Sequence, residues 1–468
     1  MKSQKQFLLL VLALFLQPAL PGSAASEARL PNLLVIMTDD QTVDDLRVMS
    51  QTRALLADPG TTFENSFVSY PLCCPSRSTF LTGQYSHNHG VVANAGPNGY
   101  PQLDETNTLA VWLQGSGYFT ALVGKYMNGY GEGSSAVPPG WSRWFALMGP
   151  STYHFYDYTV SEDGVPVSYG RGEADYQTDV LAAEAERILR SRAGAKEPFF
   201  LAVTPVAPHL ETRGGATVAP RPAPRHEGAF ADEPLPKKPS FNEVNVADKP
   251  PHVRKRPRLG KAGVEDVAFV HRARLASLLA VDDLVGRLVR ALEETGEIHN
   301  TVIVFTSDNG FFLGEHRLPK GKFLPYEEAV RVPLLVRGGS FPAGQTASQL
   351  VSNVDLAPTL LELAQATPRR VLDGQSFVRL PLEPGLGRDR TLLIEGARLN
   401  SNSPSYSAVR DERWLYVEYD NGGRELYDLK SDPYQLKSRH NERGLAGIRA
   451  GLAARLARLR NCSGEECL

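Results

Sequence analysis

The stretch NLLVIMTDD, residues 32–40, carries five consecutive apolar residues and then ends in two aspartates. The same pattern, an apolar run followed abruptly by polar residues, recurs in YFTALVGK (118–125), PFFLAVTPVAPH (198–209) and NTVIVFTSDNG (300–310). Runs this apolar, without alternation, are typical of strands that are buried on both faces. Helical patterns lie between them, most clearly at residues 267–296. Strands that alternate with helices predict an α/β fold built on a mostly parallel sheet.

Polar side chains follow each of these four predicted strands. In sheets of this kind, ligands bind beyond the carboxyl ends of the strands. A single aspartate after a strand is usually a turn or helix-capping residue, and a single lysine there is usually solvated. The repetition nevertheless predicts that six polar residues converge on one rim of the sheet: Asp39, Asp40, Lys125, His209, Asp308 and Asn309.

The N-terminus has the pattern of a secretory signal peptide. Two lysines precede the apolar run FLLLVLALFL (7–16), and small residues follow in PGSAAS (21–26). A membrane-spanning helix needs roughly 20 apolar residues, about twice the length of this run. We therefore expect residues 1–25 to be removed, leaving a soluble protein outside the cytosol with no membrane attachment.

The length of the chain predicts more than one domain. The chain has 468 residues, which is more than one hydrophobic core usually serves. We expect a catalytic domain at residues 26–388 and a smaller domain at 389–468. The smaller domain carries short alternating strands, an Asn-Gly-Gly turn at 421–423 and a helical pattern at 443–460, which predict an antiparallel sheet and a terminal helix.

Residues 210–262 are rich in proline and show no period. Loops this long inside a compact domain are usually functional lids or disordered inserts, and the position directly after the strand that ends at His209 favours a lid. Its basic stretch HVRKRPRLGK (252–261) is equally compatible with a solvated linker. The formal net charge of the whole chain is −2, which argues neither for nor against a polyanionic partner. We expect no nucleic-acid partner.

The four cysteines form two pairs that need different explanations. Cys462 and Cys467 lie close together at the C-terminus, where a small disulfide loop is expected in an oxidising compartment. Cys73 and Cys74 are neighbours, which bridge each other poorly because disulfide geometry needs a larger separation. A zinc site made with His87 and His89 is disfavoured, since structural zinc sites separate their cysteines by at least two residues.

The residues around the adjacent cysteines carry a specific motif. The segment PLCCPSRSTFLTG (71–83) contains C-x-P-S-R and, three residues later, L-T-G. It resembles the signature of type I sulfatases, and this resemblance implies the alkaline-phosphatase-like sulfatase fold and a sulfuric ester hydrolase. It also implies that a formylglycine-generating enzyme oxidises Cys73 to formylglycine, an aldehyde, before folding is complete. Cys74 stands at the variable position of the motif and is expected to be a small buried thiol.

Further phrases extend the resemblance over nearly the whole mature chain. Within the family they are most similar to the enzymes that remove the 6-O-sulfate of N-acetylglucosamine: VGKYMNGYG (123–131), PPGWSRWFAL (138–147), FTSDNG (305–310) and CSGEEC (462–467). The implied substrate is a sulfated sugar in a glycosaminoglycan. An arylsulfatase or another carbohydrate sulfatase is the alternative, and a catalytically silent polyanion-binding relative with unmodified Cys73 is a third. A phosphoryl hydrolase of the same fold is disfavoured, since it needs two zinc ions and a Thr or Ser nucleophile.

The predicted metal ligands are Asp39, Asp40, Asp308 and Asn309. They offer only oxygen atoms, which suit a hard cation such as Ca²⁺ or Mg²⁺. Such a cation can lower the pKa of a hydrated aldehyde and hold a sulfate oxygen. The resemblance implies one Ca²⁺ per chain, with the formylglycine at Cys73 as a further ligand.

The predicted catalytic residues are cations and a histidine around Cys73. Pro75 suits the first turn of a helix, which places residue 73 at a helix N-terminus and Arg77 one turn further on. The family pattern implies that Lys125 and Lys322 bind the sulfate and that Lys322 or His209 protonates the leaving alkoxide, with Lys320 the rival of Lys322. Many sulfatases place a histidine two residues after the first lysine. That position is Met127 here, so His209 is expected to take its role.

The number of glycosylation sites bears on the compartment to which the protein is exported. The one N-glycosylation sequon is Asn461-Cys462-Ser463, an inefficient type. A lysosomal enzyme is expected to carry more, so a secreted or periplasmic location is favoured over a lysosomal one.

Overall fold

The computed structural model describes residues 29–399 and 403–468. The predicted signal peptide, residues 1–25, lies outside the described residues. Among those that are described, no helix is both long and apolar enough to cross a membrane.

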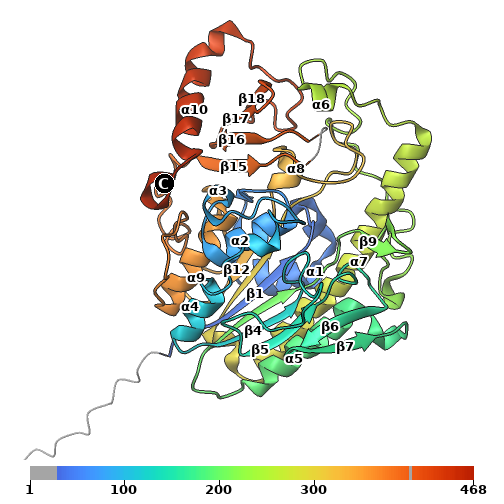
Figure 1. Cartoon of the computed structure of the whole chain (residues 1–468), viewed down its shortest axis with the longest axis vertical. Helices are drawn as coiled ribbons and strands as arrows, with labels where there is room; N and C mark the ends of the chain where they lie inside the picture. The colour runs from blue at the N-terminus through green and yellow to red at the C-terminus, as the bar shows by residue number, and fades with distance from the viewer. Residues whose placement is uncertain (1–28, 400–402) are drawn as a thin grey trace, which may run out of the picture.

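A large twisted sheet forms the lower half of the molecule in the view of Figure 1. Its ten strands lie in the order β13 (Gln345–Ala347), β2 (Thr61–Phe63), β12 (Leu334–Arg337), β11 (Thr301–Ser307), β1 (Asn32–Thr38), β8 (Phe199–Thr204), β4 (Phe119–Gly124), β5 (Arg143–Leu147), β6 (Tyr158–Glu162) and β7 (Val165–Tyr169). Only β12 and β6 run against the other strands of this sheet. The prediction of a mixed, mostly parallel sheet is therefore confirmed.

The four strands predicted from apolar runs are the four neighbours β11, β1, β8 and β4 at the centre of this sheet. They are parallel, and the register pairs Thr38 at the end of β1 with Ser307 at the end of β11. The polar residues that follow these strands therefore begin at the same edge of the sheet. This is the predicted rim.

Helices cover both faces of the sheet, as Figure 1 shows. Successive side chains of a strand point to opposite faces. Accordingly, Leu34 and Ile36 pack with α5 (Gln177–Ser191) and the long α7 (Lys261–Glu294). Their neighbours Leu33, Val35 and Met37 pack in a second core with the helices α2 (Cys73–Thr82), α4 (Leu109–Gly115) and α9 (Leu356–Ala364).

A smaller antiparallel sheet follows near the C-terminus. Its strands, in spatial and chain order, are β15 (Leu392–Gly396), β16 (Tyr406–Arg410), β17 (Trp414–Tyr419) and β18 (Arg424–Asp428). The Asn-Gly-Gly turn connects β17 to β18, and α10 (Ala446–Leu459) packs on this sheet. These elements confirm the predicted antiparallel sheet and terminal helix, while the domain boundary near residue 388 stays a prediction.

The proline-rich insert at 210–262 contains little regular structure. It begins with the hairpin β9 (Glu211–Arg213) and β10 (Ala216–Val218) and includes the short α6 (Pro251–Arg254). The α6 segment lies against the C-terminal sheet, where the rings of His252 and Tyr419 are 4.8 Å apart. The remaining α-helices and strands are α1 (Ser50–Thr52), α3 (Ser86–His89), α8 (Glu327–Val330) and the paired strands β3 (Ser66–Phe67) and β14 (Val351–Ser352).

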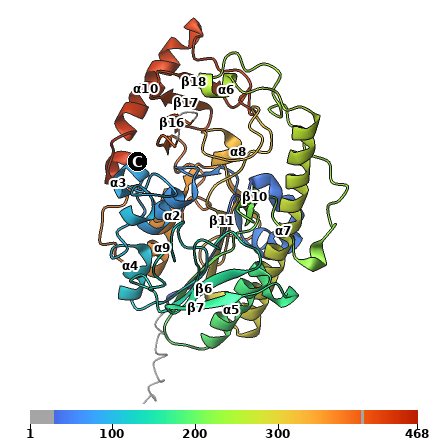
Figure 2. The ribbon, with the colours of Figure 1, turned by 45° about the vertical axis from the view of Figure 1, so that its right-hand side comes forward.

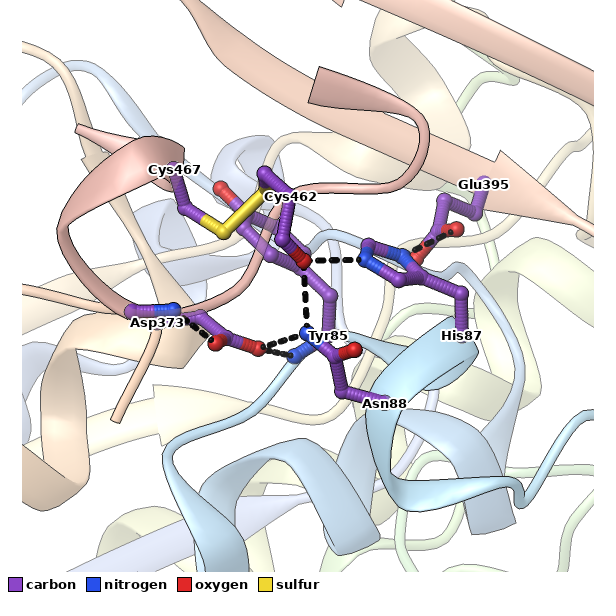
Figure 3. Close-up of a disulfide and its surroundings, with 8 residues drawn as sticks. Tyr85, His87, Asn88, Asp373, Glu395, Cys462 and Cys467 are labelled. Atoms are coloured by element: carbon purple, nitrogen blue, oxygen red, sulfur yellow. Dashed lines mark hydrogen bonds and ion pairs between the residues drawn. A yellow bond between two sulfur atoms is a disulfide. The ribbon is translucent and has the colours of Figure 1, made fainter. Parts of the chain in front are cut away.

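The predicted disulfide between Cys462 and Cys467 is confirmed. Figure 3 shows the disulfide beside α3, the helix that follows α2. The carbonyl oxygen of Cys462 accepts hydrogen bonds from the His87 ring and the Asn88 amide, each at 2.9 Å. The Asp373 carboxylate accepts from the same amide and from the backbone N–H of Tyr85, both at 2.8 Å.

Candidate active site

Helix α2 delivers Cys73 to the rim of the large sheet. The helix begins at Cys73 itself, has Pro75 in its first turn and ends before Gly83, whose φ of +64° suits a residue without a side chain. All its side chains are buried, and both Cys73 and Cys74 are 0% exposed. The predicted helix N-terminus at residue 73 is thus confirmed, and the positive end of the helix dipole favours negative charge there.

The six polar residues of the rim do come together. The backbone N–H of Asp40 donates to Asp308 at 3.2 Å, and the Asn309 amide donates to the Asp40 carboxylate at 2.5 Å. Asp40 itself has a φ of +67°, which is uncommon for a residue other than glycine and turns its carboxylate into the cluster. The Lys125 ammonium contacts Asp39, and the His209 Nε2 lies 3.5 Å from Asp40.

The Cys73 sulfur lies at the centre of these groups. Lys322 Nζ is 2.9 Å from it, Asp39 Oδ1 is 3.5 Å away, and the Tyr153 hydroxyl is 3.9 Å away. Burial, with the nearby Asp39 charge, raises the pKa of the Cys73 thiol to about 12. Because the thiolate is the reactive form of cysteine, the unmodified side chain is a poor nucleophile at neutral pH.

Three cations balance three carboxylates in this cluster. Arg77 donates to the Asp308 carboxylate at 2.7 Å and to the Lys125 carbonyl at 2.8 Å. The Lys322 ammonium contacts the Asp40 carboxylate. Burial alone would lower the pKa of Lys125, but the charge of Asp39 outweighs it, so the pKa lies above its usual value. The lysines therefore stay charged and can hold an anion.

The donor set fits a divalent cation. One ligand atom each from Asp39, Asp40, Cys73 and His209 lies within 4.8 Å of the others. The buried Oδ1 of Asn309 has no hydrogen-bond partner among the described residues, which is costly for an amide unless another group binds it. The Asp308 oxygens already accept from Asp40 and Arg77. Asp39, Asp40 and Asn309 offer hard oxygen atoms, the ligands that Ca²⁺ and Mg²⁺ prefer.

His209 lies at the entrance of the cluster, where its side chain is 17% exposed. Its Nδ1 donates to the carbonyl of Leu210 at 2.6 Å, which leaves Nε2 facing the cluster. The ring stacks on Tyr153 with centroids 4.1 Å apart. Burial lowers the pKa of His209, so the ring is neutral at pH 7.

The structure separates Lys322 from its rival Lys320. Lys320 pairs with Asp266 on α7 at 2.8 Å and makes no contact with Cys73. The other histidines considered are held elsewhere: His87 by Glu395 and Cys462, His89 by Thr79, and His316 by Glu243. Met127 is buried in a hydrophobic core.

Tyr153 belongs to the site and was missed by the sequence analysis. Its hydroxyl accepts hydrogen bonds from Lys125 at 2.8 Å and from the Asn128 amide at 2.6 Å. With both lone pairs used, its own hydrogen is free to point toward Cys73. Asn128 directly follows Met127 within the phrase VGKYMNGYG, and nothing in the sequence around Tyr153 indicates a strand end or a motif.

Arg274 was also missed. It lies inside α7 and is 0% exposed. Its guanidinium donates to the carbonyl of Asp40 at 2.6 Å and to that of Pro208, next to His209, at 3.0 Å, and it stacks over the Phe311 ring. In the sequence it is one arginine of an amphipathic helix, which is usually a solvated position.

Comparison with known proteins gives a consistent result. A sulfatase family model matches residues 31–366, and a model of the C-terminal part of N-sulphoglucosamine sulphohydrolase matches residues 314–462. The N-acetylglucosamine-6-sulfatase of Capra hircus is 34% identical over 95% of this chain and 86% of its own length. An arylsulfatase of Volvox carteri is 33% identical over 98% of this chain and 79% of its own length.

Solved structures include one described as a complex with its substrate, D-glucosamine-2-N,6-O-disulfate. It superposes on this chain with a TM-score of 0.78 and 26% sequence identity. The superposition covers 92% of this chain and 98% of the chain in that structure.

Proposed function

The chain belongs to the sulfatase family of sulfuric ester hydrolases, and we propose that it hydrolyses the 6-O-sulfate of N-acetylglucosamine units in glycosaminoglycans. The observation that carries the substrate is the similarity to N-acetylglucosamine-6-sulfatases along nearly the whole chain. The neighbour with a sulfated glucosamine substrate supports it further. Because an arylsulfatase of Volvox carteri is similarly related, arylsulfatase activity is the alternative function. The assay described below distinguishes the two activities.

The proposed nucleophile is residue 73 after oxidation of its thiol to formylglycine by a formylglycine-generating enzyme. The motif around Cys73 and the raised pKa of its buried thiol support this assignment, since an unmodified thiol there is poorly reactive. A hydrated aldehyde supplies two geminal hydroxyls, one to attack sulfur and one whose proton loss later expels sulfate.

Asp39, Asp40, Asp308 and Asn309 are the proposed ligands of one Ca²⁺, with Mg²⁺ as the alternative. A ring nitrogen of His209 lies in the same cluster of possible ligand atoms, but a hard cation favours the oxygen donors over this ring. The cation supplies Lewis acidity toward a sulfate oxygen and lowers the pKa of a bound hydroxyl.

The cations of the chain bind the sulfate in this proposal. Lys125, Lys322 and Arg77 surround residue 73 and are held in place by Asp39, Asp40 and Asp308 respectively. Because these cations are already ordered and desolvated, they stabilise negative charge on the transferred sulfate without further reorganisation. Tyr153 adds one neutral donor on the side of Lys125 and Asn128.

His209 is the proposed donor of a proton to the leaving sugar alkoxide once its Nε2, which faces Asp40, has taken up a proton. Lys322, whose raised pKa keeps its ammonium charged, is the alternative donor. Both side chains lie at the entrance of the cluster, where they are 17% and 11% exposed, whereas that of Lys125 is 0% exposed. A leaving group bound at the entrance therefore meets His209 and Lys322 first.

The export of the chain to a secreted or periplasmic location is part of the proposal and rests on the N-terminal sequence pattern alone.

The test is a paired assay on 6-sulfated N-acetylglucosamine and on a generic aryl sulfate. It compares the wild type with Cys73→Ala and with the control Cys74→Ala, whose neighbouring thiol is equally buried. We expect desulfation of the sugar by the wild type and the control and none by Cys73→Ala. Turnover of the aryl sulfate by the wild type, with no activity on the sugar, would refute the proposed substrate but leave the protein a sulfatase. Mass spectrometry of the peptide that contains residue 73 reports the aldehyde independently of activity.

A further inference from the structure

A groove of about 500 Å³ lies between the β9–β10 hairpin and the N-terminal half of α7. Figure 2 shows β10 beside this helix. We call this groove of about 500 Å³ the hairpin groove. The residues of its lining that matter here are Arg213, Arg221, Phe230, Phe269, Arg272 and Lys320.

Two of the four cations in the hairpin groove lack a carboxylate of their own. Arg221 is neutralised by Glu211, which it meets through both carboxylate oxygens, and Lys320 pairs with Asp266. Arg213 reaches the same Glu211 only at 4.0 Å.

Arg272 makes no ion pair within the part of the chain that the structure describes. The lining therefore carries positive charge in excess, and the Arg272 guanidinium and the loosely paired Arg213 guanidinium are available to an anion. Guanidinium groups match the geometry of carboxylate and of tetrahedral oxyanions better than ammonium groups do.

An aromatic surface lies among these cations. Phe269 is 58% exposed on α7, and Phe230 lines the groove from the insert. An exposed aromatic ring alone is ordinary on protein surfaces. Its combination with the Arg213 and Arg272 guanidinium groups in one groove fits a ligand with flat apolar faces and anionic substituents. Sugar units that carry sulfate or uronate groups have both features.

The hairpin groove is adjacent to the active site along two chain connections. Lys320 precedes Lys322 by two residues, and Arg213 follows His209 by four. An extended chain spans at most about 3.6 Å per residue, so these pairs of Cα atoms are within about 7 and 14 Å. Lys322 and His209 are also the groups at the entrance of the cluster. A polymer that leaves the entrance can therefore reach the groove.

We propose that the hairpin groove binds the anionic sugars that follow the sulfated sugar in the active site. The occupant is a stretch of sulfated, uronate-containing polysaccharide. This inference rests on the proposed function and adds to it a binding site for the polymer outside the catalytic cluster. The first residues of the basic stretch at 252–261 lie elsewhere, since α6 packs against the C-terminal sheet.

The test compares two substrates that share the reacting sugar. One is 6-sulfated N-acetylglucosamine, and the other is an octasaccharide with that sugar at its end and uronate and sulfate groups beyond it. The variants are Arg213→Ala with Arg272→Ala, and Phe269→Ala alone. The matched control is Arg379→Ala with Arg458→Ala, which removes the same charge from exposed positions outside the groove.

We expect the KM for the octasaccharide to rise about fivefold or more in the double groove variant, from the loss of two exposed charge pairs. The KM should also rise in Phe269→Ala, while kinetics on the monosaccharide stay unchanged. The effect of the arginines should fade at high salt, because exposed charges are screened. Unchanged octasaccharide kinetics, or an equal effect in the control, overturns the proposal.

Binding separates this proposal from the function on which it rests. If the wild type hydrolyses neither substrate, the octasaccharide can still be titrated by calorimetry against the same variants. Weaker binding in the groove variants but not in the control supports the groove, and equal binding in all of them refutes it.

Discussion

Arg274 holds Asp40 through its backbone: the guanidinium donates a 2.6 Å hydrogen bond to the Asp40 carbonyl from inside helix α7. The same group reaches the Pro208 carbonyl at 3.0 Å. One buried side chain thus fixes the segments that carry the Asp40 carboxylate and the His209 ring.

Arg274→Lys is therefore expected to lower kcat/KM by about 100-fold, because a lysine cannot reach both carbonyls and small displacements at a reacting centre are costly. The concentration of divalent cation that half-restores activity after chelation should also rise. Arg290→Lys, at an exposed position of the same helix, is the control. Full activity in Arg274→Lys would show that the two segments hold their positions without it.

Tyr153→Phe is expected to reduce kcat on the sulfated sugar by about 10- to 100-fold, with little change in KM. The change removes the one hydroxyl that joins Lys125, Asn128 and residue 73. Losing one preorganised donor to a transition-state oxyanion costs roughly 100- to 1,000-fold in kcat, and a donor at longer range costs less. Tyr156→Phe, whose hydroxyl lies outside the cluster, should keep wild-type rates. Equal kcat in both variants would exclude Tyr153 from the chemistry.

His209→Asn should impair sugar desulfation far more than aryl sulfate hydrolysis. A sugar alkoxide needs a proton to leave, whereas an activated phenolate does not. Loss of the general acid should therefore lower kcat/KM by about 100-fold or more on the sugar only. The measurement is the ratio of kcat/KM values on the two substrates. Equal losses on both would assign His209 to holding Asp40, from which its Nε2 is 3.5 Å away, and leave Lys322 as the proton donor.

Stability should depend on the titration of Glu315. Burial, reinforced by the charge of Glu328, raises the pKa of Glu315 to about 7 from the usual 4.5. A raised carboxyl pKa means that the folded state holds the proton more tightly, so its stabilising effect is complete below pH 4.5 and is lost as pH rises to 7.

Relative to Glu315→Gln, the wild type should therefore lose on the order of 3 kcal/mol of unfolding free energy across this interval. Glutamine keeps an oxygen for the Leu313 N–H, which the carboxylate accepts at 2.6 Å. Denaturant unfolding of both proteins at pH 4.5, 6 and 7.5 measures the difference. Parallel curves for the two proteins would contradict the raised pKa.

Removal of the terminal disulfide should destabilise the chain without abolishing activity at room temperature. For a loop closed by cysteines five positions apart, chain entropy gives about 2 kcal/mol. Cys462→Ser with Cys467→Ser should lower the free energy of unfolding by that amount, and the wild type in reductant should match the variant. A wild type that is insensitive to reductant would mean that the contacts of Figure 3 hold the C-terminus by themselves.

The central strands could be predicted because their signal is local. Residues 33–37 and 302–305 are buried on both faces, so each must be apolar throughout, and the polar residue that ends each run marks the rim. The short strands β2 and β13 were not predicted, since three residues are too few to show a period. Helix α7 begins at Lys261, before the apolar pattern that predicted it, because its first turns are largely exposed.

The site could be predicted only where a strand end or a motif carries it. Tyr153 reaches the cluster from the connection between β5 and β6, and Arg274 from the middle of a helix 234 positions away from Asp40. Neither position has a sequence pattern of its own, because its role is set by what the tertiary fold places next to it. The choice between Lys320 and Lys322 likewise depended on which side chain turns inward.

The complete burial of Cys73 sets a time limit on any enzyme that must handle its thiol. Arg77, one helical turn from Cys73, donates a hydrogen bond to Asp308, which lies 231 positions later in the chain. At about 5–20 residues per second, the ribosome needs roughly 10 to 50 s to make that intervening length. During that interval the residues of β11 do not yet exist, and the segment around Cys73 cannot reach its final enclosure. Slower translation between these two points therefore lengthens the interval in which residue 73 is accessible. Under the proposed oxidation to formylglycine, the fraction of converted molecules should rise with it.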